Sequence, residues 1–260
     1  MMKTGHGEEG THVPSGVMDR EILAKQQSAG NLNWWIAGRR DLFRTLIERL
    51  PVPDECRYLE LGPGAASNLD ILARRGTAEV FIADADVSAL EICSASGYGR
   101  GVLVDAGQLP YKTASFDAVL AADVLEHVTN DKNALDEIAR VLKPGGFAIV
   151  TVPAFASLWS EHDVRAGHVR RYRQTNLLKL VDLQSFEVEE VCYFNWIFFL
   201  PTLLIMKVMS LASPRTYADA TSVPRWLNSA LAIIFRWDIR FARKFRPPFG
   251  VSLLLVLKRS

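Results

Sequence analysis

Apolar residues recur along this chain at two different spacings. Between residues 19 and 50 they fall at steps of three to four, so that Trp35, Leu42 and Leu46 share one face of a predicted helix. Residues 1–18 are polar and glycine-rich, without the apolar core of a signal peptide, and we expect them to be disordered.

After residue 53 short apolar runs alternate with helical segments. The runs are "RYLELGPG", "EVFIADAD", "GVLVDAG", "FDAVLAADV" and "GFAIVTVPA", and the intervening helices are expected over residues 67–75, 88–96 and 130–142. Such alternation predicts a mostly parallel sheet with helices on both faces. Further along, a helix is expected over residues 175–183, and "SFEVEEVCYF" and "GVSLLLVLKR" are predicted to be the last two strands.

The composition bears on the protein's partners and on its cellular location. The chain has 260 residues and a formal net charge of +1, which argues against a dedicated nucleic-acid binder. Its 3 cysteines are scattered, without a CxxC motif, so we expect a reducing, cytoplasmic location.

A glycine turn closes the first predicted strand. Gly62 and Gly64 allow a sharp turn and close approach of a ligand, and the next helix begins just beyond them. Acids end the following strands, at Asp84 or Asp86, at Asp105 and at Asp123. One such acid is readily explained as a helix cap, as Asp86 is before Ser88. Several of them at one edge of a sheet are more typical of a site that holds a ribose and a base.

The charge of this turn separates two classes of nucleotide. A dinucleotide fingerprint GxGxxG would place its third glycine at Ser67, and Glu60 would then face a pyrophosphate. A cationic ligand such as S-adenosylmethionine (SAM) suits Glu60 better.

The segments "YLELGPGAASN", "FIADADVS", "LVDAGQLPYKTASFDAVLAADVLEHV" and "LKPGGFAIVTVPA" resemble, in order and spacing, the motifs of class I SAM-dependent methyltransferases. The closest subgroup acts on small molecules and lipids and is related to ubiquinone-biosynthesis methyltransferases. "NWWIAGRR" is similar to an HWWF-x-x-RR element of that group, with Asn33 in place of the histidine. Ala66 replaces the third glycine of the family's GxGxG.

The resemblance implies a doubly wound, Rossmann-like α/β fold with a seven-stranded sheet whose last strand is antiparallel. The core would be residues 54–193 and 249–260, with an N-terminal helical cap over residues 19–53 and a helical insertion over residues 194–248. It also implies a set of residues that bind SAM, or S-adenosylhomocysteine as the product: Glu60, Gly62, Pro63, Gly64, Asp84, Asp86, Val87, Asp105, Ala106 and Asp123. Among these, Asp86 would bind the ribose hydroxyls and Asp105 the adenine amino group. Trp35 and Arg39 of the cap would lie near the acceptor.

The stretch "LWSEHDVRAGHVRRY", residues 158–172, follows the fifth strand, where acceptor-binding loops belong. In one interpretation His162 or His168 removes a proton from the acceptor, and an anionic group is held by Arg165, Arg170, Arg171 and Tyr172. In another these charges pair among themselves. A metal site at His162, Asp163 and His168 is not expected, because no third strong ligand has a clear spacing. His127 after the fourth strand is a further catalytic candidate, although the LEH element has structural roles in the resembled family.

The insertion carries an unusual amount of apolar surface. "FNWIFFLPTLLIMKVMSLA" is long enough to span a membrane, but the chain must return to supply the last strand, so a re-entrant or interfacial element is favoured over a span. "RWLNSALAIIFRWDIRFARKFR" is basic and amphipathic. Peripheral membrane contact through residues 194–246, a closed lid and a dimer contact remain alternatives, and the oligomeric state stays open.

Together these patterns predict a SAM-dependent methyltransferase that O-methylates a small or lipid-like acceptor, anionic or polyprenyl-linked if the protein binds membranes. Nucleic acid is not expected as a partner. The alternatives are an NAD-dependent oxidoreductase or epimerase on a similar sheet, and a SAM-binding protein without catalytic activity.

Overall fold

The structure is a computed structural model that describes residues 33–74, 77–212 and 223–260. The predicted disordered tail and the first part of the predicted cap, residues 19–32, lie outside the described residues.

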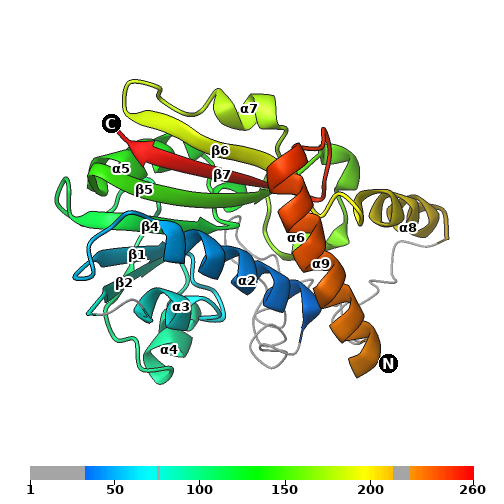
Figure 1. The fold of residues 1–260 in the computed structure, drawn as a ribbon, viewed down its shortest axis with the longest axis horizontal. Coiled ribbons are helices and arrows are strands. Elements are labelled where there is room, and N and C mark those ends of the chain that lie inside the picture. The colour runs from blue at the N-terminus through cyan, green and yellow to red at the C-terminus, as the bar shows by residue number, and fades with distance from the viewer. Residues whose placement is uncertain (1–32, 75–76, 213–222) are drawn as a thin grey trace, which may run out of the picture.

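Seven strands form one sheet in the order β3-β2-β1-β4-β5-β7-β6 (Figure 1). Their bounds are Arg57–Leu61 (β1), Glu79–Asp84 (β2), Gly101–Leu103 (β3), Phe116–Ala122 (β4), Leu142–Pro153 (β5), Phe186–Phe194 (β6) and Ser252–Arg259 (β7). Strands β1 to β5 pair in parallel, and β7 pairs antiparallel with both β5 and β6. The predicted doubly wound sheet with an antiparallel last strand is therefore confirmed, although β3 is shorter than the apolar run suggested.

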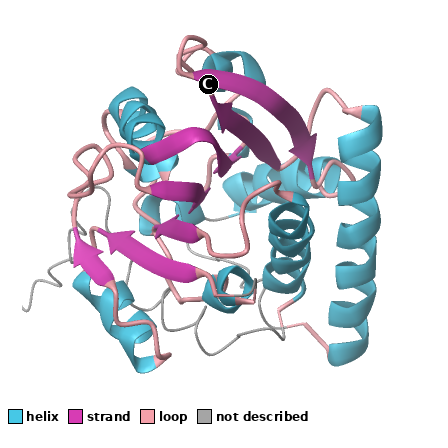
Figure 2. Cartoon of the chain, turned by 60° about the vertical axis from the view of Figure 1, so that its left-hand side comes forward, coloured by secondary structure: helices cyan, strands magenta, loops and turns pink. Residues whose placement is uncertain are grey.

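Helices cover both faces of the sheet (Figure 2). They are α2 (Trp34–Arg49), α3 (Leu69–Ala73), α4 (Val87–Ala95), α5 (Asp131–Val141), α6 (Glu161–Arg165), α7 (Gln174–Leu178), α8 (Phe199–Ala212) and α9 (Arg225–Phe245), with short 3-10 turns at Leu125–His127 and Ala156–Leu158. Alternate residues of β4 point to opposite faces. Val119 packs in the core under α5 and α7, whereas Leu120 packs in the core under α2, α3, α4 and α9.

The described part of the N-terminal cap is the helix α2, which packs against α9 at an angle (Figure 1). The side chain of Asn33 caps α2 by accepting hydrogen bonds from the backbone N–H groups of Trp35 and Ile36. The N–H of Trp34 donates to Asn228 Oδ1 of α9 at 2.7 Å. Gly38 allows the two helices to approach closely, because a β-carbon there would lie 2.3 Å from Cδ1 of Phe235.

The insertion consists of α8 and α9, joined to β6 by a buried polar contact. The backbone N–H groups of Asn195 and Ile197 donate to the carboxylate of Asp238, which is fully buried on α9. Burial of the donors and the acceptor makes this contact expensive to break. Within the described residues no helix is long and apolar enough to cross a membrane.

The close contact at Gly38 can be tested by replacing it with alanine. The added methyl group would overlap the Phe235 ring, and such overpacking costs about 1–3 kcal/mol, against about 1 kcal/mol gained from the helix propensity of alanine. The difference of these terms predicts that Gly38→Ala lowers the free energy of unfolding by up to about 2 kcal/mol in urea denaturation.

A double-mutant cycle supplies the control. In a Phe235→Leu background the same Gly38→Ala change should cost clearly less, because the ring is gone. Equal costs in the two backgrounds would show that the contact with the ring does not limit the packing of α2 on α9.

Candidate functional site

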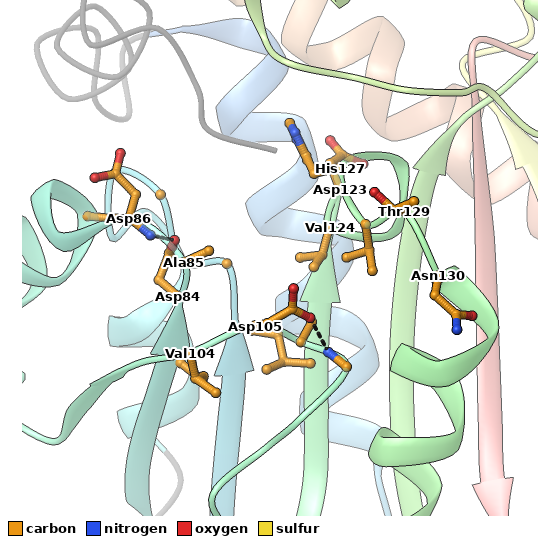
Figure 3. Close-up of a pocket in the computed structure, with 18 of the residues that line it drawn as sticks. Asp84, Ala85, Asp86, Val104, Asp105, Asp123, Val124, His127, Thr129 and Asn130 are labelled. Carbon is orange, nitrogen blue, oxygen red and sulfur yellow. Dashed lines mark hydrogen bonds between the residues drawn. The ribbon is translucent and has the colours of Figure 1, made fainter. Parts of the chain in front are cut away.

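A cavity of about 370 Å³ opens at the carboxyl ends of β1, β2 and β4. The strand order reverses between β1 and β4, and ligands of doubly wound sheets bind in the crevice at such a switch point. The cavity is lined by Leu61, Gly62, Gly64, Ala83, Asp84, Ala85, Asp86, Ala89, Val104, Asp105, Ala106, Gly107, Asp123, Val124, His127, Val128, Thr129, Asn130 and Asn133. Figure 3 shows Asp84 and Asp86 on one side of it and Asp123 and His127 on the other.

The glycine turn adopts the backbone conformation that its sequence predicts. Gly62 and Gly64 have φ values of 62° and 50°, in the left-handed region that favours glycine. A β-carbon on Gly62 would also lie 2.7 Å from Cγ2 of Val124. Ala66, in the position of the third glycine, has φ 59°, a conformation that costs alanine about 1–2 kcal/mol. The backbone at Ala66 therefore keeps the left-handed conformation although the residue is not glycine.

Glu60 lies beneath this turn rather than in the cavity wall. Its carboxylate is fully buried, and Oε1 accepts a hydrogen bond from Asn68 Nδ2 at 3.0 Å. Burial raises the pKa of Glu60 to about 7. The side chain of Glu60 is thus placed to support the turn, and Pro63 and Val87, also predicted to bind the cofactor, are likewise not among the residues that line the cavity.

Three acids line the cavity on the side of β2 and β3. Burial raises the pKa of Asp84 to about 6, and its Oδ1 accepts the N–H of Asp86 at 2.8 Å. Asp86 caps α4 through Oδ1, which accepts the N–H of Ser88 at 2.8 Å. Asp105 Oδ1 accepts the N–H of Gly107 at 2.7 Å. The capping interpretation of Asp86 is thus correct, and it leaves the second oxygen of that carboxylate for a ligand.

Asp123, at the end of β4, is held by a buried arginine from the N-terminal cap. Arg39 Nη1 lies 2.7 Å from Asp123 Oδ2, and Arg39 Nη2 donates to Thr151 Oγ1 at 2.8 Å. The hydroxyl of Thr151 in turn donates to Asp123 Oδ1 at 3.0 Å. Asp123 has φ 58°, so these contacts stabilise an uncommon backbone conformation. Arg39, predicted to lie near the acceptor, is paired with Asp123 in the cavity wall.

Trp35 likewise lies within the packing of helices. Its ring meets that of Phe235 edge-on, with centroids 5.5 Å apart, and that of Trp34 in the same way at 5.6 Å. It is not among the residues that line the cavity.

The stretch of residues 158–172 folds around one buried carboxylate. Asp163 is fully buried and accepts hydrogen bonds from His168 Nδ1 at 2.8 Å and from Arg171 at 2.7 and 3.0 Å. It also accepts the backbone N–H of Ser160 at 2.8 Å. These donors hold the pKa of Asp163 far below its usual range despite its burial. The interpretation in which the charges pair among themselves describes this centre correctly.

Several side chains predicted to hold an anionic acceptor have partners within the protein. Arg171 is bonded to Asp163, and Arg170 Nη1 lies 2.6 Å from Asp131 Oδ2. The hydroxyl of Tyr172 is buried and donates to Asp131 Oδ2 or to the Leu125 carbonyl, at 2.9 and 3.0 Å. Arg165 closes the short helix α6. Internal carboxylates thus hold Arg170 and Arg171, because a buried acid without a cationic or hydrogen-bonding partner would be destabilising.

The three predicted catalytic histidines do come together, next to Glu126. The ring centroid of His168 lies 4.8 Å from that of His127 and 6.1 Å from that of His162. His127 alone of the three lines the cavity. Burial lowers the pKa of His127 to about 4 and also lowers that of His162, so both rings are neutral at pH 7.

Glu126, in this histidine cluster, was not singled out from the sequence, and neither were Thr129, Asn130 and Asn133 of the cavity lining. Glu126 is fully buried, and burial followed by the nearby charge of Asp123 raises its pKa well above the usual range. Within the described residues neither carboxylate oxygen has a hydrogen-bond partner. Glu126, His127 and His168 each place one ligand atom within 4.8 Å of the others, a spacing that can hold a metal ion. The only signal in the sequence was its position beside His127.

Comparison with known proteins places this site in a family. A family model described as a methyltransferase domain matches residues 59–150. A tRNA (carboxymethyluridine(34)-5-O)-methyltransferase of Arabidopsis thaliana is 35% identical over 109 residues, which are 38% of this chain and 27% of the relative. A demethylmenaquinone methyltransferase of Mycobacterium sp. (strain KMS) is 31% identical over 153 residues, 50% of this chain and 64% of the relative. Each match thus spans less than two thirds of the relative.

Solved structures share the fold. A geranyl diphosphate C-methyltransferase of Streptomyces coelicolor A3(2), in complex with Mg2+, geranyl diphosphate and S-adenosyl-L-homocysteine, superposes with a TM-score of 0.55 at 12% identity, over 83% of this chain and 77% of that one. The motifs, the sheet order and the family match agree, and residues 59–150 form a class I SAM-dependent methyltransferase domain.

Proposed function

We propose that the whole chain is a SAM-dependent methyltransferase that transfers the methyl group to a hydroxyl oxygen of a small or lipid-like acceptor. The observation that carries the proposal is the cavity at the switch point, with carboxylates along one side and Asp123 and His127 at the other. A cytoplasmic location and an acceptor that is not a nucleic acid are parts of the same proposal.

The residues of the cavity fit SAM chemically. Asp86 and Asp105 each use Oδ1 in a local backbone contact, and within the described residues Oδ2 of each has no hydrogen-bond partner. Carboxylate oxygens suit the ribose hydroxyls and the adenine amino group, which are donors. Asp84 adds negative charge, which favours a cationic ligand. When bound, SAM supplies an activated methyl group on a sulfonium.

His127 is the histidine that this geometry favours as the base. It lines the cavity beside Asp123, and its low pKa keeps the ring neutral, so a ring nitrogen can accept a proton from the acceptor hydroxyl. His168 packs against His127 and is itself oriented by Asp163. We therefore assign His168 and Asp163 the role of positioning His127, in the manner of a base held by neighbouring groups.

Two alternative functions can be distinguished from a methyltransferase by experiment. An NAD-dependent oxidoreductase would need the cavity to accept a pyrophosphate beside Asp84 and Asp86, which is electrostatically unfavourable. A SAM-binding protein without activity would share the cofactor cavity but would turn over no acceptor.

The cofactor can be tested by calorimetric titration with SAM, S-adenosylhomocysteine and NAD. We expect micromolar binding of the first two and none of NAD. Asp86→Ser keeps an oxygen that caps α4 but removes the charged acceptor for the ribose, so SAM affinity should fall about 10- to 100-fold. Asp136→Asn, at an exposed acid on α5, is the matched control. Tight NAD binding without SAM binding would contradict the proposal.

SAM affinity should also depend on pH. The pKa values of Asp84 and Glu60 are raised, to about 6 and about 7, so both carboxyls bind protons below those values and lose negative charge. A cationic ligand favours their ionised forms. We expect the Kd for SAM to fall as pH rises from 5.5 to 7.5, with protons released on binding. Asp84→Asn should flatten the lower part of this profile, and a Kd of wild type that is constant over the range would rule out the linkage.

The base can be tested once an acceptor is found in a screen of small molecules and lipid extracts. His127→Gln should lower kcat about 100-fold or more, because general bases contribute typically 10²–10⁴-fold, with the Kd for SAM nearly unchanged. Chelation by EDTA should leave the wild-type rate intact. Loss of activity on chelation, restored by a divalent cation, would instead assign Glu126, His127 and His168 to a metal.

A further inference from the structure

Exposed apolar side chains of this protein are concentrated on the insertion. Of 17 large apolar residues that are exposed within the described chain, 10 lie between residues 197 and 245. They are Ile197, Leu200, Leu204 and Ile205 on or before α8, and Trp226, Ile233, Ile234, Trp237, Phe241 and Phe245 on α9. Soluble proteins rarely expose so many large apolar side chains together without a partner.

The helix α9 has two apolar faces. One is buried, with Phe235, Ile239 and Ala242 in the core under α2. At 100° per residue, Trp226 and Trp237 project from the opposite side of the helix, and their side chains are 73% and 66% exposed. Packing on the protein explains the first face only, so the second face needs another partner.

The exposed residues of α8 adjoin this outward face. The ring of Trp196, just before α8, lies 5.1 Å from that of Phe241 on α9, centroid to centroid. Figure 1 shows α8 extending away from the sheet, on the same side of the molecule as α9. Leu200 and Leu204 on α8 are 64% and 65% exposed. Trp196 thus joins the start of α8 to the outward face of α9, and both helices carry exposed apolar residues.

A basic flank borders the outward face of α9. Arg236, Arg240 and Lys244 follow one another at steps of four along α9, beside the outward apolar face. Arg236 is paired with Asp41, whereas within the described residues Arg240 and Lys244 have no carboxylate partner. A groove of about 900 Å³ between α2 and α9 adjoins the flank and is lined by both basic and acidic residues, among which Arg243 is paired with Glu190.

We propose that α8 and α9 dock the protein on the surface of an anionic lipid bilayer. The ten apolar residues would enter the headgroup region, with the tryptophans at the interface, and Arg240 and Lys244 would bind lipid phosphates. Charge decides between a bilayer and a second copy of this chain. A two-fold contact through this face would bring equal basic flanks together, whereas anionic lipids neutralise them.

Docking here has a consequence for the cofactor cavity. Trp34 of α2 is bonded to Asn228 of α9, and one turn further Arg39 holds Asp123 in the cavity wall. The docked helix is therefore joined through α2 to the end of the cavity where an acceptor would enter. Membrane attachment itself does not depend on the proposed reaction.

Sedimentation of the full chain with large unilamellar vesicles tests the proposal. We expect binding to phosphatidylcholine vesicles that contain phosphatidylglycerol, weaker binding to phosphatidylcholine alone, and weakening by salt. Trp226→Ser combined with Trp237→Ser should lower the partition coefficient at least 10-fold. Arg240→Gln combined with Lys244→Gln should lower it about 25-fold on anionic vesicles, because each basic residue near such a surface contributes roughly fivefold.

Leu103→Ser combined with Leu183→Ser is the matched control, since these leucines are 59% and 71% exposed but lie outside the insertion. It should leave binding unchanged, and SAM binding by every variant checks that the core is folded. The proposal would be overturned if the protein bound neither kind of vesicle, or if Trp226→Ser combined with Trp237→Ser left vesicle binding unchanged. A dimer in analytical ultracentrifugation that the tryptophan pair abolishes, without vesicle binding, would assign the surface to self-association.

Discussion

A buried guanidinium joins three elements of this protein at the carboxyl edge of the sheet. Arg39 of α2 reaches Asp123 at the end of β4 and Thr151 on β5, with atoms 2.7 and 2.8 Å apart. The arginine is buried, so its charge must be compensated within the protein, and Asp123 is the compensating charge. Because Asp123 also adopts a left-handed backbone conformation at the cavity wall, the helix α2 and the shape of the cavity depend on the same contact.

Buried charges are also compensated within the protein in the loop of residues 158–172. Asp163 gathers His168, Arg171 and the N–H of Ser160, and Asp131 gathers Arg170 and Tyr172. Each buried carboxylate is thus the common hydrogen-bond acceptor for several residues of the surrounding loop. The histidine cluster results from this folding, since the Asp163 contact directs His168 toward His127 and toward Glu126, whose Oε1 lies 4.0 Å from His168 Nε2. The ion pairs that stabilise this loop and the histidines proposed for catalysis therefore belong to one connected set of contacts.

The sequence predicted the sheet well because its signals are local. A strand buried on both faces is an uninterrupted apolar run, and the glycine turn after β1 follows from backbone conformation alone. The acids after β2, β3 and β4 could be assigned to one edge because parallel strands end together. The arginines of residues 158–172 could not be assigned in this way. The partner of Arg171, a ligand or Asp163, depends on the conformation of the whole loop, which the local sequence pattern does not reveal.

What the sequence by itself determined is the order of the elements, the switch point and the acids that line it, because these follow from periodicity and from the ends of strands. Only the tertiary structure decided that Glu60 lies beneath the cavity, that Arg39 compensates Asp123 and that one face of α9 is buried while the other is exposed. Both faces of α9 are apolar in the sequence, and only packing against α2 distinguishes them. The physical reason is that burial and ion pairing are properties of residues far apart in the chain, such as Arg39 and Asp123, which come together only when the chain folds.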